Sequence, residues 1–108
     1  MIVKNEDLKL DKLEKKVSRK ILSKDGSLMM VEVHFQKGGI GEAHAHEEHE
    51  QVCYVAKGSF EVSLGEEKKV LQAGDCFYAK KNKRHAVLAL ENGILVDVFT
   101  PIREDILK

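Results

Sequence analysis

The sequence predicts an all-β protein, a single small sandwich or barrel. From residue 28 onward, short β-branched or alternating segments are separated by Gly, Asn and Asp, at the spacing typical of this class. The chain has 108 residues, 43% of them apolar, which is enough for one hydrophobic core but not for two. No repeat or low-complexity linker interrupts it, and Pro101 is the single proline.

Eight strands are expected after residue 28, each bounded by turn residues. In order they are Leu28–Gln36, Gly41–His46, Gln51–Ala56, Ser59–Leu64, Lys69–Gln72, Asp75–Ala79, Ala86–Leu90 and Ile94–Thr100.

The first of these strands shows the alternation most clearly. Its apolar residues recur at every second position, at 29, 31, 33 and 35, so they share one face of a strand. Glu32 and His34 then lie on the other face. We therefore expect His34 on the outside of the barrel or in an interface, not among metal ligands.

The first 25 residues have a different pattern. Asp7 to Val17 carries leucines at 8, 10 and 13 among lysines and acids, which fits either a short helix or an extended arm. The sequence therefore predicts a helix or arm over residues 1–25, packed on a domain that spans residues 26–108. The tail from Pro101 onward is expected to form one helical turn.

Composition excludes several classes of partner. Lys plus Arg and Asp plus Glu each number 18, so no net charge attracts nucleic acid or an anionic membrane. No stretch approaches the roughly 18 apolar residues of a membrane span, and no signal peptide is recognisable. Cys53 and Cys76 are too few for a disulfide framework. A cytoplasmic protein with reduced thiols is expected.

The segment from residue 44 to 51 carries the main functional signal. His44 and His46 are two residues apart, so on a strand both imidazoles face the same side and could share a metal ion. If residues 47–50 connect a hairpin, His46 lies opposite Gln51 and His44 opposite Cys53, so Gln51 joins the histidines. His49, in that connection, is expected to point to solvent.

This segment resembles the first cupin motif, and a later one resembles the second. The first runs from Gly38 through His44, His46 and Gln51 to Gly58, and the second from Gly74 to His85, with every spacing of the cupin pattern kept. The chain departs by having Lys80 in place of proline, Asn82 in place of glycine, and glutamine in place of glutamate at 51. Asn82 can still adopt positive φ.

The cupin resemblance implies a jelly-roll barrel, or double-stranded β-helix, that holds one divalent transition metal. The implied ligands are His44, His46, Gln51 and His85. Three imidazoles with an oxygen donor suit Mn, Fe, Co, Ni or Zn, and the sequence does not choose among them. Because all four ligands are neutral, polarisation of a substrate oxygen fits better than redox cycling.

Within the cupins, the second half of the chain is most similar to KdgF-type proteins, which process unsaturated uronates released by pectin or alginate lyases. The similarity is carried by His49-Glu50-Gln51, Tyr54-Val55 and Asp97 to Asp105. It implies that Asp97, Phe99 and Arg103 face the substrate and that Asp97 moves a proton. Cys53 stands where the family has a polar residue, so its contact with substrate would be particular to this chain.

The position of Asp97 depends on the turn at residues 91–93. A two-residue Asn-Gly turn pairs Leu88 with Asp97 and directs Asp97 away from the face of His85. A three-residue turn with left-handed Gly93 pairs Val87 with Asp97 and directs it onto that face. Only the second register makes Asp97 functional.

The resemblance thus predicts ring opening of an unsaturated uronate to a linear keto-sugar acid. Two alternatives remain open: an Fe-dependent cupin dioxygenase, and a cupin that binds a small molecule without turnover. A homodimer is also expected, because a small barrel with an N-terminal segment leaves sheet edges and apolar surface to cover.

Overall fold

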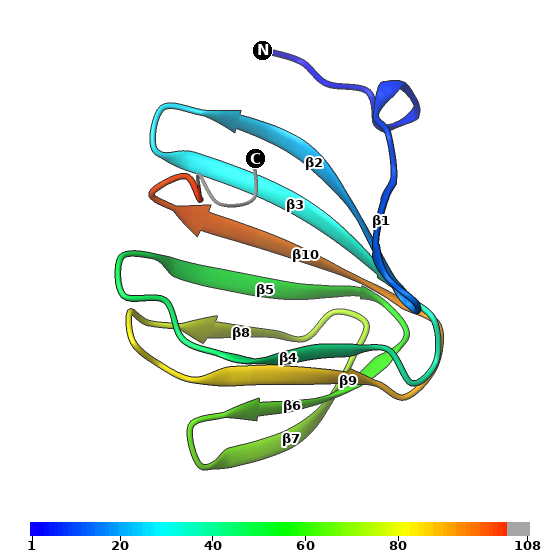
Figure 1. Cartoon of the computed structure of the whole chain (residues 1–108), viewed down its shortest axis with the longest axis vertical. Helices are drawn as coiled ribbons and strands as arrows, with labels where there is room; N and C mark the ends of the chain where they lie inside the picture. The colour runs from blue at the N-terminus through cyan, green and yellow to red at the C-terminus, as the bar shows by residue number, and fades with distance from the viewer. Residues whose placement is uncertain (104–108) are drawn as a thin grey trace.

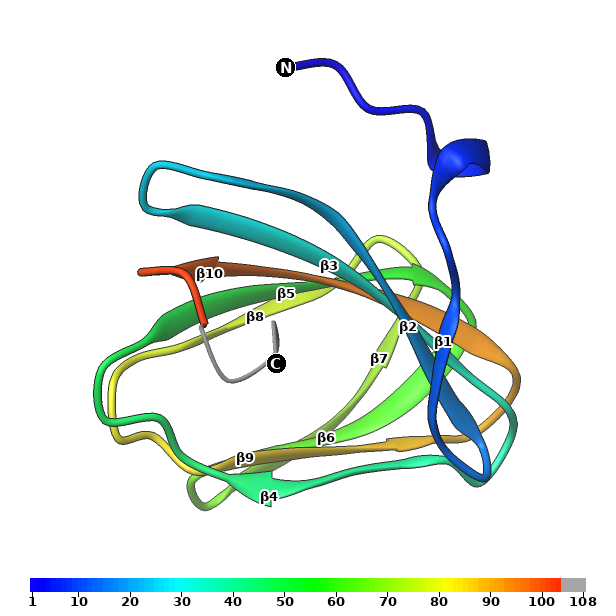
Figure 2. The same cartoon turned by 45° about the horizontal axis from the view of Figure 1, so that its top comes forward.

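The computed structural model describes residues 1–103, except for the side chains of Ala43 and His44. The described residues form two antiparallel sheets, ordered β1-β2-β3-β10-β5-β8 and β4-β9-β6-β7, which face each other as two layers (Figures 1 and 2). The strands are β1 Asp11–Glu14, β2 Val17–Asp25, β3 Leu28–Phe35, β4 Ile40–His44, β5 Glu50–Lys57, β6 Ser59–Leu64, β7 Glu67–Gln72, β8 Cys76–Ala79, β9 His85–Ala89 and β10 Gly93–Thr100. The predicted all-β class is confirmed.

All eight predicted strands are present, with ends within two residues of those expected. Alternation buries one face of most of these strands between the sheets. The core residues between the layers are Val17, Phe35, Cys53, Val55, Phe60, Val62, Phe77, Ala79, Val87, Ala89 and Leu95. A smaller cluster of Met29, Val31 and Phe99 continues this core toward one end of the sandwich.

The N-terminal segment is a pair of strands, not a helix. Residues Asn5–Asp7 form one 3-10 turn, β1 pairs with β2, and β2 pairs with β3 along almost its whole length. The extended alternative is therefore the one observed. A boundary at residue 25 falls in the β2–β3 turn and does not separate β2 from the six-stranded sheet. The predicted helical turn of the tail falls mainly on residues 104–108, outside the described residues.

Neither of the two expected hairpins around the site forms. Strands β4 and β5 lie in different sheets, and so do β9 and β10. His44 is the Cα partner of His85 and not of Cys53, while Gln51 is opposite Phe99 and Ala79. Both proposed registers for Asp97 were wrong for the same reason, because β10 pairs with β3 and β5 and never with β9.

The Asn92-Gly93 pair looks like a hairpin turn but serves as a crossing between sheets. The Asn92 side chain accepts a hydrogen bond from the Lys37 amide at 2.8 Å. A Cβ on Gly93 would stand 2.6 Å from the Lys57 carbonyl oxygen, so only glycine allows this close backbone approach. Gly93 does not have the positive φ that the bulged turn required.

Candidate functional site

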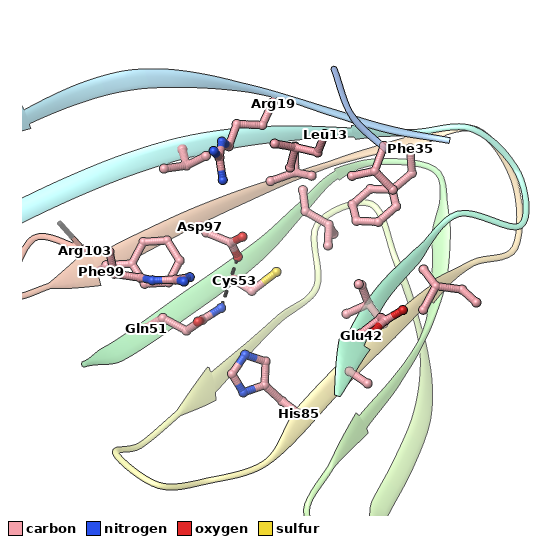
Figure 3. Close-up of a pocket in the computed structure, with 18 of the residues that line it drawn as sticks. Leu13, Arg19, Phe35, Glu42, Gln51, Cys53, His85, Asp97, Phe99 and Arg103 are labelled. Carbon is pink, nitrogen blue, oxygen red and sulfur yellow. Dashed lines mark hydrogen bonds between the residues drawn. The ribbon is translucent and has the colours of Figure 1, made fainter. Parts of the chain in front are cut away.

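A cavity of about 480 Å³ lies between the two sheets and brings most of the predicted site residues together. Its volume is within the range of small-molecule sites, roughly 300–1,000 Å³. Six residues chosen from the sequence line it: Gln51, Cys53, His85, Asp97, Phe99 and Arg103. Figure 3 shows them converging from β5, β9, β10 and the segment after β10.

The turn before β9 positions two of the histidines. Asn82 has φ 65°, the positive value that the sequence allowed it, and its amide donates to the His46 carbonyl oxygen at 2.7 Å. The Lys83 carbonyl oxygen in turn lies 3.1 Å from Nδ1 of His85. The imidazole rings of His46 and His85 are 5.7 Å apart, centroid to centroid.

The hydrogen bond to Lys83 decides which nitrogen of His85 could bind a metal. A carbonyl oxygen only accepts, so Nδ1 must carry the hydrogen, and in the neutral ring Nε2 is then the nitrogen whose lone pair can bind a cation. A backbone carbonyl that fixes the tautomer of a histidine in this way is the usual second partner of a metal ligand. His85 is 4% exposed, so its ring is also held firmly.

A hydrogen bond also fixes the orientation of the Gln51 side-chain amide. Its Nε2 donates to Asp97 Oδ1 at 3.3 Å, which directs Oε1 the other way. That oxygen is buried and accepts no hydrogen bond from any residue the structure describes. A buried carbonyl oxygen without a donor costs free energy unless a cation or water supplies the missing interaction. Both Gln51 and His85 therefore fit a bound metal ion.

His46 and His44 are the other two predicted ligands. His46 contacts the ring of His85 and, edge-on, the ring of Phe99 at 6.2 Å. The side chain of His44 is outside the described residues. Within the described part of the chain, no three His, Cys, Asp and Glu side chains form a metal-binding group.

Asp97 points into the same cavity as His85, although β10 pairs with β3 and β5 and not with β9 as both predicted registers assumed. It lies opposite Cys53 on β5 and accepts from Gln51 (Figure 3). Burial raises the pKa of its carboxyl from 3.8 to about 6, partly offset by the hydrogen bond from Cys53 and the charge of Arg103. A carboxyl in this range can both donate and accept a proton near neutral pH.

Cys53 is a buried thiol in contact with that carboxyl. Its side chain is 1% exposed, and burial, followed by the charge of Asp97, raises the pKa of the thiol far above its usual range. It therefore stays protonated and donates to Asp97. A thiolate nucleophile or thiolate ligand at this position is not supported.

Phe99 and Arg103 form one end of the cavity. Phe99 is 3% exposed, and the Arg103 guanidinium carbon lies 5.0 Å from the centre of its ring. This stacking restricts the motion of the long arginine side chain at this end of the cavity.

Three side chains were missed or misplaced by sequence reasoning. His49 is half-buried, with its ring 5.7 Å from that of His46 and Nε2 3.3 Å from the Ile102 carbonyl oxygen, so the expectation of solvent exposure was wrong. Arg19 and Glu42 also line the cavity. Inward alternation with Val17 was the signal for Arg19, but β2 was not recognised as a strand. His34, by contrast, lies on the outer face as predicted and contacts Glu32 Oε1 at 2.6 Å.

Residues 31–99 match the family described as the cupin domain. The chain is a member of the cupin family. This cupin is 50% identical over 92 residues to the pectin degradation protein KdgF of Dickeya dadantii, a match that covers 84% of each chain. The predicted family and its KdgF-like subgroup are therefore confirmed.

Solved structures agree with this assignment. The cupin superposes on KdgF from Halomonas sp. with a TM-score of 0.95 and 37% identity, covering 98% of this chain and 99% of that one. An RmlC-like cupin from Shewanella frigidimarina gives a TM-score of 0.90 at 37% identity, covering 94% and 91%. A predicted oxalate decarboxylase from Thermotoga maritima, 13% identical with a TM-score of 0.85 over 94% and 100%, shares the fold. No helix in the described residues is long and apolar enough to cross a membrane.

Proposed function

We propose that this cupin is a metal-dependent enzyme that opens the ring of 4,5-unsaturated uronates to linear keto-sugar acids. One observation carries the proposal: Asp97, Phe99 and Arg103 line the same cavity as the candidate ligands Gln51 and His85. The similarity to two proteins named KdgF, one of them described as a pectin degradation protein, supports a uronate from pectin as the substrate.

His44, His46, Gln51 and His85 would hold the metal. The tautomer of His85 and the buried Oε1 of Gln51 support this ligand set, and the cupin motifs support the other two. An ion held by neutral ligands would supply Lewis acidity toward a substrate oxygen. Mn, Fe, Co, Ni and Zn all suit three imidazoles with one oxygen donor.

The reaction is an isomerisation that needs a proton carrier and no second substrate. The bond from the anomeric carbon to the ring oxygen breaks, the anomeric hydroxyl loses its proton and becomes the aldehyde, and the ring oxygen becomes an enol. Protonation of the adjacent carbon at position 4 converts the enol to the ketone. Asp97 is placed to take and return this proton, with Gln51 and Cys53 fixing its carboxyl.

The substrate is a monomer, because only a free anomeric carbon can open. Arg103 would offer its planar fork to the uronate carboxylate, and the ring of Phe99 would pack against the sugar. Cys53 would contact the substrate through its protonated thiol, which is small enough to leave room beside Asp97.

The test is metal analysis of the purified protein followed by an absorbance assay. Ring opening removes the double bond conjugated with the carboxylate, so the ultraviolet absorbance of a monomeric unsaturated uronate should fall when the protein is added. Removal of the metal by a chelator should stop the reaction, and its return should restore it. A protein that contains metal but leaves the absorbance constant would contradict the proposed reaction.

The metal site is tested by replacing His46 or His85 with Ala. Metal content should fall to background, while the fold persists because the barrel core is apolar and does not need the ion to close. His34→Ala is the matched control, since His34 lies on the outer face and should keep full metal content. Full occupancy in either site variant would refute the ligand assignment.

A further inference from the structure

Arg19 is a cationic side chain that β2 directs into the cavity. It alternates with the buried Val17, whereas its neighbours Ser18 and Lys20 face the other side of the sheet, where Lys20 donates to Asn5 Oδ1 at 2.6 Å. Figure 3 shows the Arg19 side chain extending from β2 into the space that Asp97 and Phe99 also face.

The Arg19 guanidinium makes no hydrogen bond or ion pair with the residues that the structure describes. Asp11, opposite it on β1, is instead 3.5 Å from Lys9 Nζ. Glu14 and Glu42 line the same cavity, but both are exposed at its rim, where water screens their charges. A half-buried guanidinium without a charged partner is costly unless a ligand supplies one.

A second arginine lines the same cavity from another element of the fold. Strands β2, β3, β5, β8 and β10 direct two charged side chains into it, Arg19 and Asp97, and Arg103 adds a third from beyond β10. Arg103 stacks on Phe99 and lies near enough to Asp97 for its charge to act on that carboxyl. The two arginines therefore reach the cavity from different elements, β2 and the segment after β10, while Glu14 and Glu42 line it from exposed positions.

We propose that Arg19 is a second substrate-anchoring residue, whose guanidinium binds the carboxylate of a monomeric sugar acid in this cavity. The inference rests on the proposed function for its choice of ligand. Arg19 and Arg103 then select sugar acids over neutral sugars from two different elements of the fold. A planar guanidinium suits this role because it donates two parallel hydrogen bonds to a carboxylate.

The first test is equilibrium binding, which needs no turnover. Calorimetric titration should show that the wild-type protein binds D-galacturonate, a stable uronate, more tightly than D-galactose. Arg19→Met keeps the length of the side chain but removes its charge, and should weaken galacturonate binding about tenfold or more without changing galactose binding. Lys20→Met removes the same charge from the outer face of the same strand and should bind both sugars as the wild type does.

Other results of this titration would overturn the inference. Equal affinity of the wild type for the two sugars, or unchanged galacturonate affinity in Arg19→Met, would show that Arg19 does not bind the carboxylate. An equal loss of affinity for both sugars in Arg19→Met would show that Arg19 contacts hydroxyl groups and not the carboxylate. Arg19→Lys, which keeps the charge without the fork, should fall between the wild type and Arg19→Met, and its thermal unfolding checks that the strand is intact.

Kinetics with the unsaturated uronate separate this inference from the proposed function. Arg19→Met should raise KM about tenfold while kcat and metal content change little, since the residue binds the acid and does not move the proton. Absence of turnover in the wild type, together with galacturonate binding that depends on Arg19, would refute the proposed reaction and support the binding site. Normal turnover with an unchanged KM in Arg19→Met would support the proposed reaction and refute the role of Arg19 in binding.

Discussion

Gln51 links the candidate metal to the candidate proton carrier through the two ends of one amide. The nitrogen donates to Asp97 and the oxygen is buried without a donor among the described residues. A glutamate at this position would place a second carboxylate against Asp97, and the repulsion would raise the pKa of the pair further. Glutamine avoids this repulsion and fixes the Asp97 carboxyl with a hydrogen bond.

Asp97→Asn tests the acid–base role of this carboxyl. The substitution keeps the shape of the side chain but removes the group that accepts and returns the proton, so turnover of the unsaturated uronate should fall about a hundredfold or more. Metal content should be unchanged, because Asp97 is not among the proposed ligands. Activity within a few fold of the wild type would remove Asp97 from the mechanism.

The raised pKa of Asp97 also predicts how the stability of the metal-free protein depends on pH. The folded pKa of about 6 lies above the ordinary value of 3.8, so the folded state binds the proton more tightly. This contribution is fully present below pH 4 and is lost as the pH rises through 6. It amounts to at most about 3 kcal/mol, and less where water enters the cavity.

Denaturant unfolding of the wild type and of Asp97→Asn measures this contribution. The amide carries no charge at any pH, so the variant should gain stability relative to the wild type between pH 4 and 7. A difference between the two proteins that stays constant over this range would show that Asp97 titrates as it does in the unfolded chain.

At the scale of elements, the turn at residues 80–84 of the second cupin motif is hydrogen-bonded to the first motif. It holds His46 through the Asn82 amide and His85 through the Lys83 carbonyl oxygen. The family pattern uses proline and glycine here, whereas this chain reaches the same geometry with Asn82 at φ 65°. Asparagine tolerates that conformation better than other residues with a side chain, glycine apart.

Substitutions at Asn82 therefore test the turn. Asn82→Gly should leave unfolding and metal affinity close to those of the wild type, because glycine adopts positive φ without strain. Asn82→Val keeps the backbone N–H that donates to His46 but forces a β-branched residue into the left-handed region. This should lower the free energy of unfolding by about 1–2 kcal/mol. Metal affinity should weaken with it. Equal stability of the two variants would mean that the backbone at this turn is not constrained.

For the whole molecule, the outer face of the six-stranded sheet supports the predicted homodimer. Met30, Val98, Val52 and Tyr78 are successive cross-strand partners on β3, β10, β5 and β8. Three of them are 38%, 44% and 52% exposed, namely Met30, Val52 and Tyr78. A continuous apolar row of this kind on a sheet face favours association with a second copy.

Light scattering at micromolar concentration should therefore give the mass of a dimer. Val52→Lys introduces a charge into the middle of the row and should shift the mass toward that of a monomer. Val70→Lys is the matched control, since Val70 is 55% exposed on β7 of the other sheet, and its mass should stay dimeric. A monomeric wild type would contradict the prediction, and equal masses for the two variants would place any interface elsewhere.

The sequence by itself predicted the all-β class, the eight strands after residue 28 and the motifs that place His44, His46, Gln51 and His85 in one candidate site. These are local properties, because alternation and motif spacing are read along the chain and each strand buries one face wherever it pairs. The two motifs also indicated the cupin family, which the comparisons confirm.

Only the tertiary structure decided which strands pair. Strands that are adjacent in sequence lie in opposite sheets, β4 and β9 in one and β5 and β10 in the other. The hairpin registers predicted for Gln51 and Asp97 are therefore not formed. Asp97 reaches the cavity because β10 inserts between β3 and β5 with the correct face inward. Arg19 reaches it because β2 joins the same sheet. Both placements depend on non-local pairing, whose geometry is set by packing of the two layers and not by any local sequence signal.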